Sequence, residues 1–342
     1  MINGHGNDIH LYEGQIVADF SSNVVPYSMH PLLADYLSSQ IKIARNYPEP
    51  DAASLAKKIA GFYGIPEESV VITNGSAEAF YLVAHLFSGC SSTIVVPAFA
   101  EYEDASRIHK HTQVFIDNAA FEKQTNFDTD LVWLGNPNNP DGKFFEADHI
   151  ENLCKLNPNT YFVVDEAYTG LCSKDCSSIS RVCTTENLIL IRSLTKVFAI
   201  PGLRLGYIVA SPTICEKVKS LKMPWSVNSI AIAAGSFIID NYSLLVPNIK
   251  ELLQLSRNLQ YQLKNLDGID VVDSQTNYFL VKLHKGKSSD LKSFLISNYG
   301  LLVRDASNFR GLNSSYIRIA AQQELYNSIL VKGIKQWITT QS

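Results

Sequence analysis

Lys196 is the residue of this sequence with the widest range of chemistry open to it. It stands in Ser193-Leu194-Thr195-Lys196, directly after an apolar run at residues 188–192 that predicts a buried strand. A primary amine at the end of a strand can attack the aldehyde carbon of a ligand. Taken alone, the position fits a solvated surface lysine better, so other residues must decide between the two interpretations.

Asp165 supplies the second indication. It ends the apolar run Phe162-Val163-Val164-Asp165, which predicts a carboxylate at the end of a buried strand. A buried charge without a partner is costly, so this carboxylate needs a cation. An arginine would serve. A protonated pyridine nitrogen would serve equally, and the ion pair would keep such a ring an effective electron sink.

A turn that could bind an anion follows another predicted strand. Thr73-Asn74-Gly75-Ser76 joins that strand to a helix, and the free N–H groups at a helix N-terminus favour a small anion. Ser193, Thr195 and Arg204 could reach the same anion. Neither a Walker A sequence nor a G-x-G-x-x-G turn follows the first strands, which disfavours those two nucleotide-binding loops.

The elements that must position these residues alternate regularly. Short apolar runs predict strands, and helical patterns such as residues 77–87 and 146–155 lie between several of them. This alternation favours an α/β fold with a largely parallel sheet, whose ligands bind beyond the carboxyl ends of the strands. The predicted strands are residues 70–73, 93–96, 113–116, 131–134, 161–165, 188–192 and 206–210.

The pattern changes after Pro224. Long helices are predicted at residues 229–241 and 244–266, followed by strands at 278–283 and 316–320. We therefore expect a large domain at residues 40–228 and a small domain formed by residues 1–39 and 229–342.

Composition limits the classes of function. The chain has 342 residues, of which 46% are hydrophobic, and a formal net charge of −4. Its scattered basic residues give no surface for nucleic acid, and no apolar run reaches membrane-spanning length. We expect a cytoplasmic protein with reduced thiols. Cys172 and Cys176 lack the spacing of zinc ligands, so we expect no metal.

Four ordered motifs resemble the fold-type I enzymes that depend on pyridoxal 5′-phosphate (PLP). They are Asn136-Pro137-Asn138-Asn139-Pro140-Asp141-Gly142, Asp165-Glu166-Ala167-Tyr168, Ser193-Leu194-Thr195-Lys196 and the segment around Arg204. The resemblance implies the aspartate-aminotransferase fold, in which a large domain with a mostly parallel seven-stranded sheet between helices carries the PLP and a smaller α+β domain adjoins it. It also implies that Lys196 holds the cofactor as a Schiff base and acts as general acid/base.

The same resemblance assigns the other site residues. Asp165 would contact the pyridine nitrogen, Asn139 and Tyr168 the phenolic oxygen, and Tyr102 would stack on the ring. Arg318 would clamp the substrate carboxylate, for which a planar guanidinium is suited, although a strand-end ion pair is the alternative. The phosphate would be held by Gly75, Ser76, Ser193, Thr195, Arg204 and Tyr47, the last crossing from the other subunit of a homodimer with shared active sites.

Within the fold, the resemblance covers nearly the whole chain and narrows to histidinol-phosphate aminotransferase and to threonine-phosphate decarboxylase of cobalamin biosynthesis, and two stretches favour the decarboxylase. The opening Gly4-His5-Gly6-Asn7-Asp8 and the stretch at residues 303–309 are similar to the decarboxylase group. His5, Asn23 and Arg304 would then face an amino-acid substrate and its phosphate. The departures are Asn7 for a glycine, Ala306 for a cysteine and Asp141 for a threonine; the first bears on the phosphate pocket, the others on packing or a turn.

The catalytic residues do not separate these two reactions, since both need the same lysine, aspartate and phosphate site. We favour the decarboxylase, with the aminotransferase as the alternative. A PLP-fold transcriptional regulator would need a basic DNA-binding domain, for which the sequence has no candidate. A nicotinamide dehydrogenase would need the missing glycine turn and leaves Lys196 unexplained.

Overall fold

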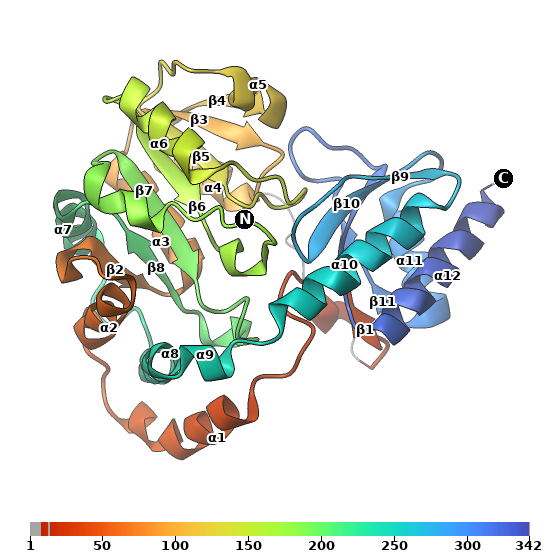
Figure 1. Ribbon diagram of the computed structural model, residues 1–342, viewed down its shortest axis with the longest axis horizontal. Coiled ribbons are helices and arrows are strands. Elements are labelled where there is room, and N and C mark those ends of the chain that lie inside the picture. The colour runs from red at the N-terminus through yellow and green to blue at the C-terminus, as the bar shows by residue number, and fades with distance from the viewer. Residues whose placement is uncertain (1–7, 13, 342) are drawn as a thin grey trace.

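The computed structural model describes residues 8–12 and 14–341, and contains a large and a small domain side by side (Figure 1). The large domain is built on a seven-stranded sheet of order β2-β8-β7-β6-β5-β3-β4. All pairs are parallel except those of β8, which runs antiparallel to β2 and β7. The strands are β2 (Val70–Thr73), β3 (Ser91–Val96), β4 (Thr112–Asp117), β5 (Leu131–Gly135), β6 (Tyr161–Asp165), β7 (Leu188–Ser193) and β8 (Gly206–Val209).

Alternating side chains of these strands build two cores. In β6, Phe162 and Val164 face one core and Val163 faces the other, as the period of two in a strand requires. The first core packs against α1 (Pro31–Gln40), α2 (Ala53–Tyr63), α6 (Ala147–Leu156) and α8 (Ser229–Asp240). The second packs against α3 (Gly75–Leu86), α4 (Ala100–Ile108) and α7 (Pro212–Leu221), while the short α5 is Asn118–Lys123. Helices thus cover both faces, as the alternation predicted.

The small domain has a core of its own, in which Phe279, Ile317 and Leu330 are buried. Its antiparallel sheet has the order β12-β13-β10-β9, and β1 pairs with β11 in parallel. The strands are β1 (Ala18–Asp19), β9 (Ile269–Val271), β10 (Tyr278–Leu283), β11 (Leu301–Leu302), β12 (Arg304–Asp305) and β13 (Tyr316–Ala320). The helices are α10 (Ile249–Lys264), α11 (Ser288–Tyr299) and α12 (Glu324–Thr340).

The predicted helix at residues 244–266 is interrupted. The structure has a short α9 (Tyr242–Leu245), a break around Pro247, and then α10. Proline lacks the N–H that an inner helical position donates, and the Asn248 side chain caps the new helix by accepting from the Glu251 N–H. The single long helix was therefore a wrong prediction.

Two terminal segments of the expected small domain pack with the large one. Leu33 and Leu37 of α1 and Ala231 and Ala234 of α8 belong to the core of the large sheet. Figure 1 shows both helices beside the large domain. The boundaries at residues 39/40 and 228/229 remain a prediction about folding units.

Among the described residues, no single helix combines the length and apolar composition of a membrane span; α8 and the segment Tyr242–Lys264 meet that test only together, as a pair bent by 97°.

Candidate active site

Most of the predicted cofactor ligands line one cavity of about 470 Å³ at the carboxyl edge of the large sheet. Strands β2, β5, β6 and β7 end at this edge, and β8 begins there because it runs the opposite way: Gly206 is paired with both Thr73 and Ser193. The predicted residues that line the cavity are Asn23, Gly75, Ser76, Asn139, Asp165, Tyr168, Ser193, Thr195, Lys196, Arg204 and Arg318.

Asp165 lies at the floor of this cavity. One carboxylate oxygen accepts from the Tyr102 hydroxyl (2.6 Å) and the other from the Ala167 N–H (3.0 Å). Burial raises its pKa to about 6, and Tyr102, Ala167 and Lys196 oppose that rise. The described residues thus give this carboxylate no adjacent arginine, which leaves the charge incompletely compensated.

Tyr102 does not take the stacking position that the resemblance implied. Its side chain is 1% exposed, its hydroxyl is bonded to Asp165, and its ring stacks on Trp133 with centroids 6.1 Å apart. Phe99 lines the cavity instead. The stacking assignment for Tyr102 was therefore wrong. Phe99 lies three residues before Tyr102, at the N-cap of α4. The sequence of this short segment does not reveal which of the two aromatic side chains faces the cavity.

Gly75, Ser76, Ser193, Thr195 and Arg204 form a compact anion cradle. Gly75 begins α3 with φ +75°, and a Cβ there would lie 2.5 Å from Nη2 of Arg204. The hydroxyls of Ser193 and Thr195 lie 2.8 Å apart on the same side. The close approach of backbone N–H groups, two hydroxyls and a guanidinium at a helix N-terminus suits a phosphate.

Lys196 lines the same cavity. Its Nζ lies 5.9 Å from the centre of the Tyr168 ring, and it is close enough to Asp165 to oppose the rise of that carboxyl's pKa. Tyr168 itself is held edge-on against Tyr278, with ring centroids 5.0 Å apart. The amine is therefore inside the cavity and not on the surface.

The opposite wall of the cavity comes from the small domain. Arg318 of β13 is 5% exposed and donates to the Asn139 side chain and to the Ser21 carbonyl. Asn23 is 3% exposed, and neither its amide nitrogen nor its oxygen has a hydrogen-bond partner among the described residues. A buried amide in that state needs a polar partner, which a ligand or an ordered water can supply.

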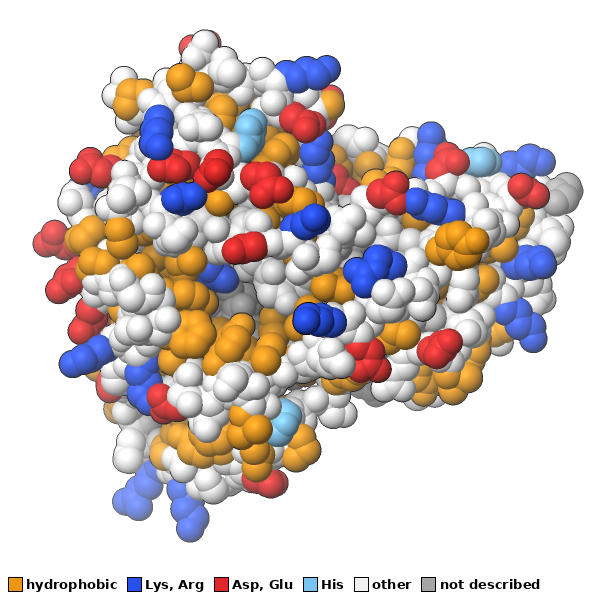
Figure 2. All heavy atoms as spheres, in the orientation of Figure 1, with side chains coloured by type: hydrophobic (Ala, Val, Ile, Leu, Met, Phe, Trp, Pro, Cys, Tyr) orange, Lys and Arg blue, Asp and Glu red, His pale blue; other side chains and the backbone are white. Residues whose placement is uncertain are grey.

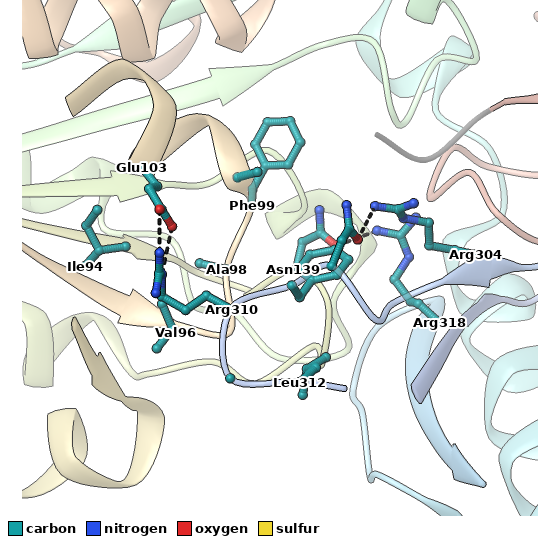
Figure 3. Close-up of a pocket in the computed structure, with 14 residues that line it drawn as sticks. Ile94, Val96, Ala98, Phe99, Glu103, Asn139, Arg304, Arg310, Leu312 and Arg318 are labelled. Carbon is teal, nitrogen blue, oxygen red and sulfur yellow. Dashed lines mark hydrogen bonds and ion pairs between the residues drawn. The ribbon is translucent and has the colours of Figure 1, made fainter. Parts of the chain in front are cut away.

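A second arginine stands beside Arg318. Arg304 of β12 is its direct partner in the antiparallel register, and its guanidinium donates to the Asn308 side chain (2.8 Å). Burial and the charge of Arg318 lower the pKa of Arg304 to about 10. Arg304, Arg318 and Asn139 lie at one end of an adjoining cavity of about 320 Å³ (Figure 3).

The other end of this adjoining cavity is closed by a pair that sequence reasoning missed. Arg310 donates two hydrogen bonds to the Glu103 carboxylate (2.8 and 2.6 Å), and its guanidinium lies 4.0 Å from the centre of the Phe115 ring. Figure 3 shows Glu103 and Arg310 facing each other at one end of the cavity, with Arg304 and Arg318 at the opposite end. The pair joins the loop after β12 to α4, so it links the small domain to the large one.

Besides Tyr102, two further predicted ligands are placed in neither cavity. His5 lies outside the described residues, as does Asn7. Tyr47 is 86% exposed and contacts Trp225, with ring centroids 5.5 Å apart. Its expected position in the partner subunit's site stays a prediction.

The other departures from the motifs have structural positions, as expected. Asp141 is buried in the turn after β5, where it accepts from the Asn138 side chain (2.8 Å), the Lys143 N–H (3.1 Å) and the Asn118 side chain (2.8 Å). Ala306 is fully buried between Leu280 and Phe309. Neither side chain lines either cavity.

Comparison with known proteins decides the family. The sequence pattern of the family described as "Aminotransferase class I and II" matches residues 15–331. The chain belongs to this family. Class I and II aminotransferases depend on PLP, so this chain is a PLP-dependent enzyme with the aspartate-aminotransferase-like fold.

Three relatives show how the chain compares within the family. It is 31% identical over 330 residues to the adenosylcobalamin biosynthesis bifunctional protein CobDQ of Leptospira interrogans, covering 92% of this chain but only 38% of that protein. The L-threonine-O-3-phosphate decarboxylase of Porphyromonas gingivalis superimposes with a TM-score of 0.90 and 34% identity, covering 94% and 100% of the two chains. The histidinol-phosphate aminotransferase of Clostridium acetobutylicum gives 0.85 and 26%, with coverages of 95% and 100%.

The residues of this class I and II aminotransferase fit the cofactor. PLP carries a phosphate, a pyridine nitrogen and an aldehyde. To match these groups the cavity offers an anion cradle, a buried carboxylate without an ion-pair partner among the described residues, and the amine of Lys196. When bound, the cofactor supplies an electron sink for the bond that breaks at the substrate Cα. The substituent that breaks away is set by which bond the protein holds perpendicular to the ring, so the substrate side of the cavity decides the reaction.

Proposed function

We propose that this enzyme decarboxylates a phosphorylated amino acid, as threonine-phosphate decarboxylase does, in cobalamin biosynthesis. The observation that carries the proposal is a pair of arginines directly opposite each other on β12 and β13: Arg304, which is half-buried, and Arg318, which is buried. Like charges in that arrangement repel, and burial lowers the pKa of both. A substrate that carries a phosphate and a carboxylate on one molecule would relieve the repulsion.

The names of the relatives support the same substrate. The decarboxylase from Porphyromonas gingivalis covers the chain almost completely and has the higher identity of the two solved structures, 34% against 26%. Within this proposal Arg318 clamps the carboxylate, while Arg304, His5 and Asn23 bind the phosphate. The unpartnered Asn23 amide favours a ligand at that position.

The proposed roles on the cofactor side follow the cavity. Lys196 binds the cofactor covalently and moves the proton at the substrate Cα, and Asp165 holds the pyridine nitrogen. Asn139 and Tyr168 face the phenolic oxygen, and Gly75, Ser76, Ser193, Thr195 and Arg204 hold the phosphate. Their shared position at one edge of the sheet supports these roles.

Transamination of histidinol phosphate is the second candidate. The likeness to the Clostridium acetobutylicum enzyme supports it. Histidinol phosphate has a phosphate but no carboxylate, so such an enzyme would need a carboxylate clamp only for its second substrate. In such an enzyme the phosphate of the first substrate and the carboxylate of the second would bind to the two arginines at different stages of the reaction. This explains less directly why the arginines lie side by side.

One assay separates the candidates. O-Phosphothreonine should release CO₂, whereas histidinol phosphate with 2-oxoglutarate should yield no glutamate. Threonine is the matched control for the phosphate, and Lys196→Ala is the control for the site. Glutamate formation without CO₂ release would replace the decarboxylase with the aminotransferase.

We also propose a homodimer in which Tyr47 completes the partner's phosphate site. Tyr47, Met223 and Trp225 are 86%, 74% and 49% exposed, which is unusual for large apolar side chains and favours an interface. Hydrophobic side chains also gather over α1, α8 and α9 at the lower left of Figure 2. We place the enzyme in the cytoplasm, whose reducing conditions suit its free cysteines. Sedimentation velocity of wild type and Trp225→Asp tests the dimer; a monomeric wild type contradicts it.

A further inference from the structure

An ion pair that the proposed function does not use lies buried behind the cofactor cavity. Glu166 directly follows β6 and is 1% exposed, and Arg192 is the last residue but one of β7. Oε2 of Glu166 lies 3.2 Å from Nη1 of Arg192, and the guanidinium packs on the Tyr63 ring of α2, 5.2 Å from its centre. Neither residue of the pair lines either cavity, so we expect it to contact neither cofactor nor substrate.

Hydrogen bonds fix the direction of both charged groups. The Glu166 carboxylate accepts from the Ser177 hydroxyl (2.9 Å) and from the Ser178 N–H (2.5 Å). The Arg192 guanidinium donates to the Ser177 hydroxyl (3.0 Å) and to the Thr169 hydroxyl (3.0 Å). Thr169 in turn donates to the carbonyl of Glu166 (3.1 Å). These five residues form one connected set of bonds, which we call the buried network.

Stability alone does not explain an ion pair at this place. Val164 and Leu190, two residues before Glu166 and Arg192, belong to the apolar core of the large sheet. In such a core, two apolar side chains of similar volume are often as stable as a buried ion pair or more stable. What they lack is direction, because only a hydrogen-bonded network holds its members at one distance and one orientation.

The ion pair lies where the backbone pairing of β6 and β7 ends. The register of the two strands ends at Asp165 and Ile191, and the Glu166 N–H adds one more bond to the Ile191 carbonyl (2.8 Å). Ser193 lies two residues beyond that point. The side chains of Glu166 and Arg192 therefore connect the two strand ends past the last paired residues.

Three members of the buried network are each the chain neighbour of a residue that lines the cofactor cavity. These neighbours are Asp165 and Glu166, Tyr168 and Thr169, and Arg192 and Ser193. Successive side chains of a strand point to opposite faces. In β6 and β7 the first of these faces carries the groups that open into the cavity, and the other carries the ion pair. A shift on the network side thus moves the cavity side with it.

We propose that Glu166 and Arg192 are positioning residues that fix the spacing between the cofactor ligands at the ends of β6 and β7. They hold Asp165 and Tyr168, on one strand end, at a set distance from Ser193 on the other. The pyridine nitrogen, the phenolic oxygen and the phosphate of PLP are then met at once by groups in the correct places. This inference rests on the proposed roles of Asp165, Tyr168 and Ser193.

The dissociation constant for PLP, measured on the apoenzyme, tests the ion pair. Glu166→Gln keeps the shape of the side chain but removes its charge. Glu166→Met/Arg192→Met replaces both charges by apolar groups that can fill the core. We expect both variants to bind PLP about tenfold more weakly or worse, as is typical when the residue that orients a ligand-binding group is lost. A folded double variant that binds PLP as wild type does overturns the proposal.

Two milder variants keep the test decisive if the ion-pair variants do not fold. Thr169→Val and Ser177→Ala leave both charges in place and remove only bonds of the buried network. Each should raise the dissociation constant for PLP severalfold. Unchanged affinity in both would show that the bonds do not position the cofactor ligands.

The visible absorbance of the bound cofactor gives a readout that a loss of stability does not move. A ring nitrogen that Asp165 holds less firmly withdraws less charge, so the pH at which the absorbance changes should rise in Glu166→Gln. Asn187→Ala is the matched control. Asn187 is buried at the other end of the same two strands, and its side chain donates to three carbonyls (2.8, 2.9 and 3.1 Å). This variant should lose stability but keep the affinity and the pH of the change; the same shift in Asn187→Ala contradicts the proposal.

Two further variants separate this inference from the proposed function. Asp165→Asn and Ser193→Ala remove the proposed cofactor ligands themselves. If they leave the affinity for PLP unchanged, the proposed roles are wrong and the inference falls with them. If they weaken PLP binding and the network variants do not, only the inference is overturned. The affinity for PLP does not depend on the O-phosphothreonine assay, so a failed assay leaves this result standing.

Discussion

The two sides of the active site are built in different ways. The cofactor side is made by loops at the ends of neighbouring strands of one sheet, with backbone N–H groups, short hydroxyls and one arginine around Gly75. The substrate side is made by long side chains from the small domain, Arg304 and Arg318, that reach toward the large one. The position of the first depends on the topology of the large sheet, whereas the position of the second depends on how the two domains meet. We therefore expect mutations on the two sides to affect different quantities.

Removing Lys196 has the largest expected effect. Lys196→Ala should lower turnover by about 10⁴-fold or more, because both the covalent anchor and the proton-transferring group are lost. The visible absorbance of the bound cofactor should disappear as well. Lys250→Ala, an exposed lysine at the start of α10, is the control and should change neither. Retained turnover would break the assignment of the cofactor side.

The substrate side should separate into two functions. Arg318→Ala should lower kcat/KM about 100-fold for every amino-acid substrate, because a buried guanidinium partner of the carboxylate is lost. Arg304→Ala should weaken only phosphorylated substrates and leave the cofactor absorbance intact. Arg257→Ala, exposed on α10, is the control. Equal losses with phosphorylated and unphosphorylated substrates in both variants would mean that the arginines do not divide the work.

On the cofactor side, the buried charge of Asp165 should lower the stability of the apoenzyme at high pH. Since the pKa of Asp165 is raised to about 6 by burial, the folded apoenzyme binds this proton more tightly than the unfolded chain. Its contribution to stability is therefore present below pH 4 and is lost as pH rises through 6. At pH 8, apo Asp165→Asn should be more stable than apo wild type by on the order of 3 kcal/mol, since each tenfold change in proton affinity is worth about 1.4 kcal/mol.

Urea unfolding at pH 4.5 and pH 8 measures this difference. The gain from Asp165→Asn should shrink at the lower pH, and PLP should stabilise wild type more than the variant. Asp267→Asn, an exposed carboxylate, should show no such dependence. A variant less stable than wild type at pH 8 would show that the native site already compensates the charge.

The smallest effect is expected at the link between the domains. Glu103→Gln should raise KM severalfold with little change in kcat, because a partly exposed ion pair contributes modestly while it holds the loop that bears Asn308, the partner of Arg304. Rising salt should raise KM of wild type by a larger factor than that of the variant, because salt weakens substrate binding in both but screens the Glu103–Arg310 pair only in wild type. Glu122→Gln breaks a surface ion pair with Lys143 within the large domain and is the control. An unchanged KM would make Glu103 and Arg310 irrelevant to the site.

The sequence predicted the large sheet well because its strands are short apolar runs separated by helical patterns, and all seven lie within two residues of the predicted bounds. The anion cradle was also predicted, since a strand-to-helix turn with Gly75 is a local signal. Contacts between distant segments were not. Glu103 and Arg310 are 207 residues apart in sequence, and each looks like an ordinary surface charge. The side-chain directions that bring the Tyr102 hydroxyl to Asp165 and leave Phe99 lining the cavity likewise produce no recognisable pattern in the local sequence.

The reversed direction of β8 has an evolutionary consequence. Because β7 enters the site edge and β8 leaves from it, the segment between them carries Lys196 at one end and Arg204 at the other, and Arg204 itself has a left-handed φ of +58°. The Lys196 amine and the Arg204 guanidinium are therefore held by the same short connecting segment. An insertion or deletion in this segment would shift both groups at once, so we expect homologous enzymes to keep its length constant.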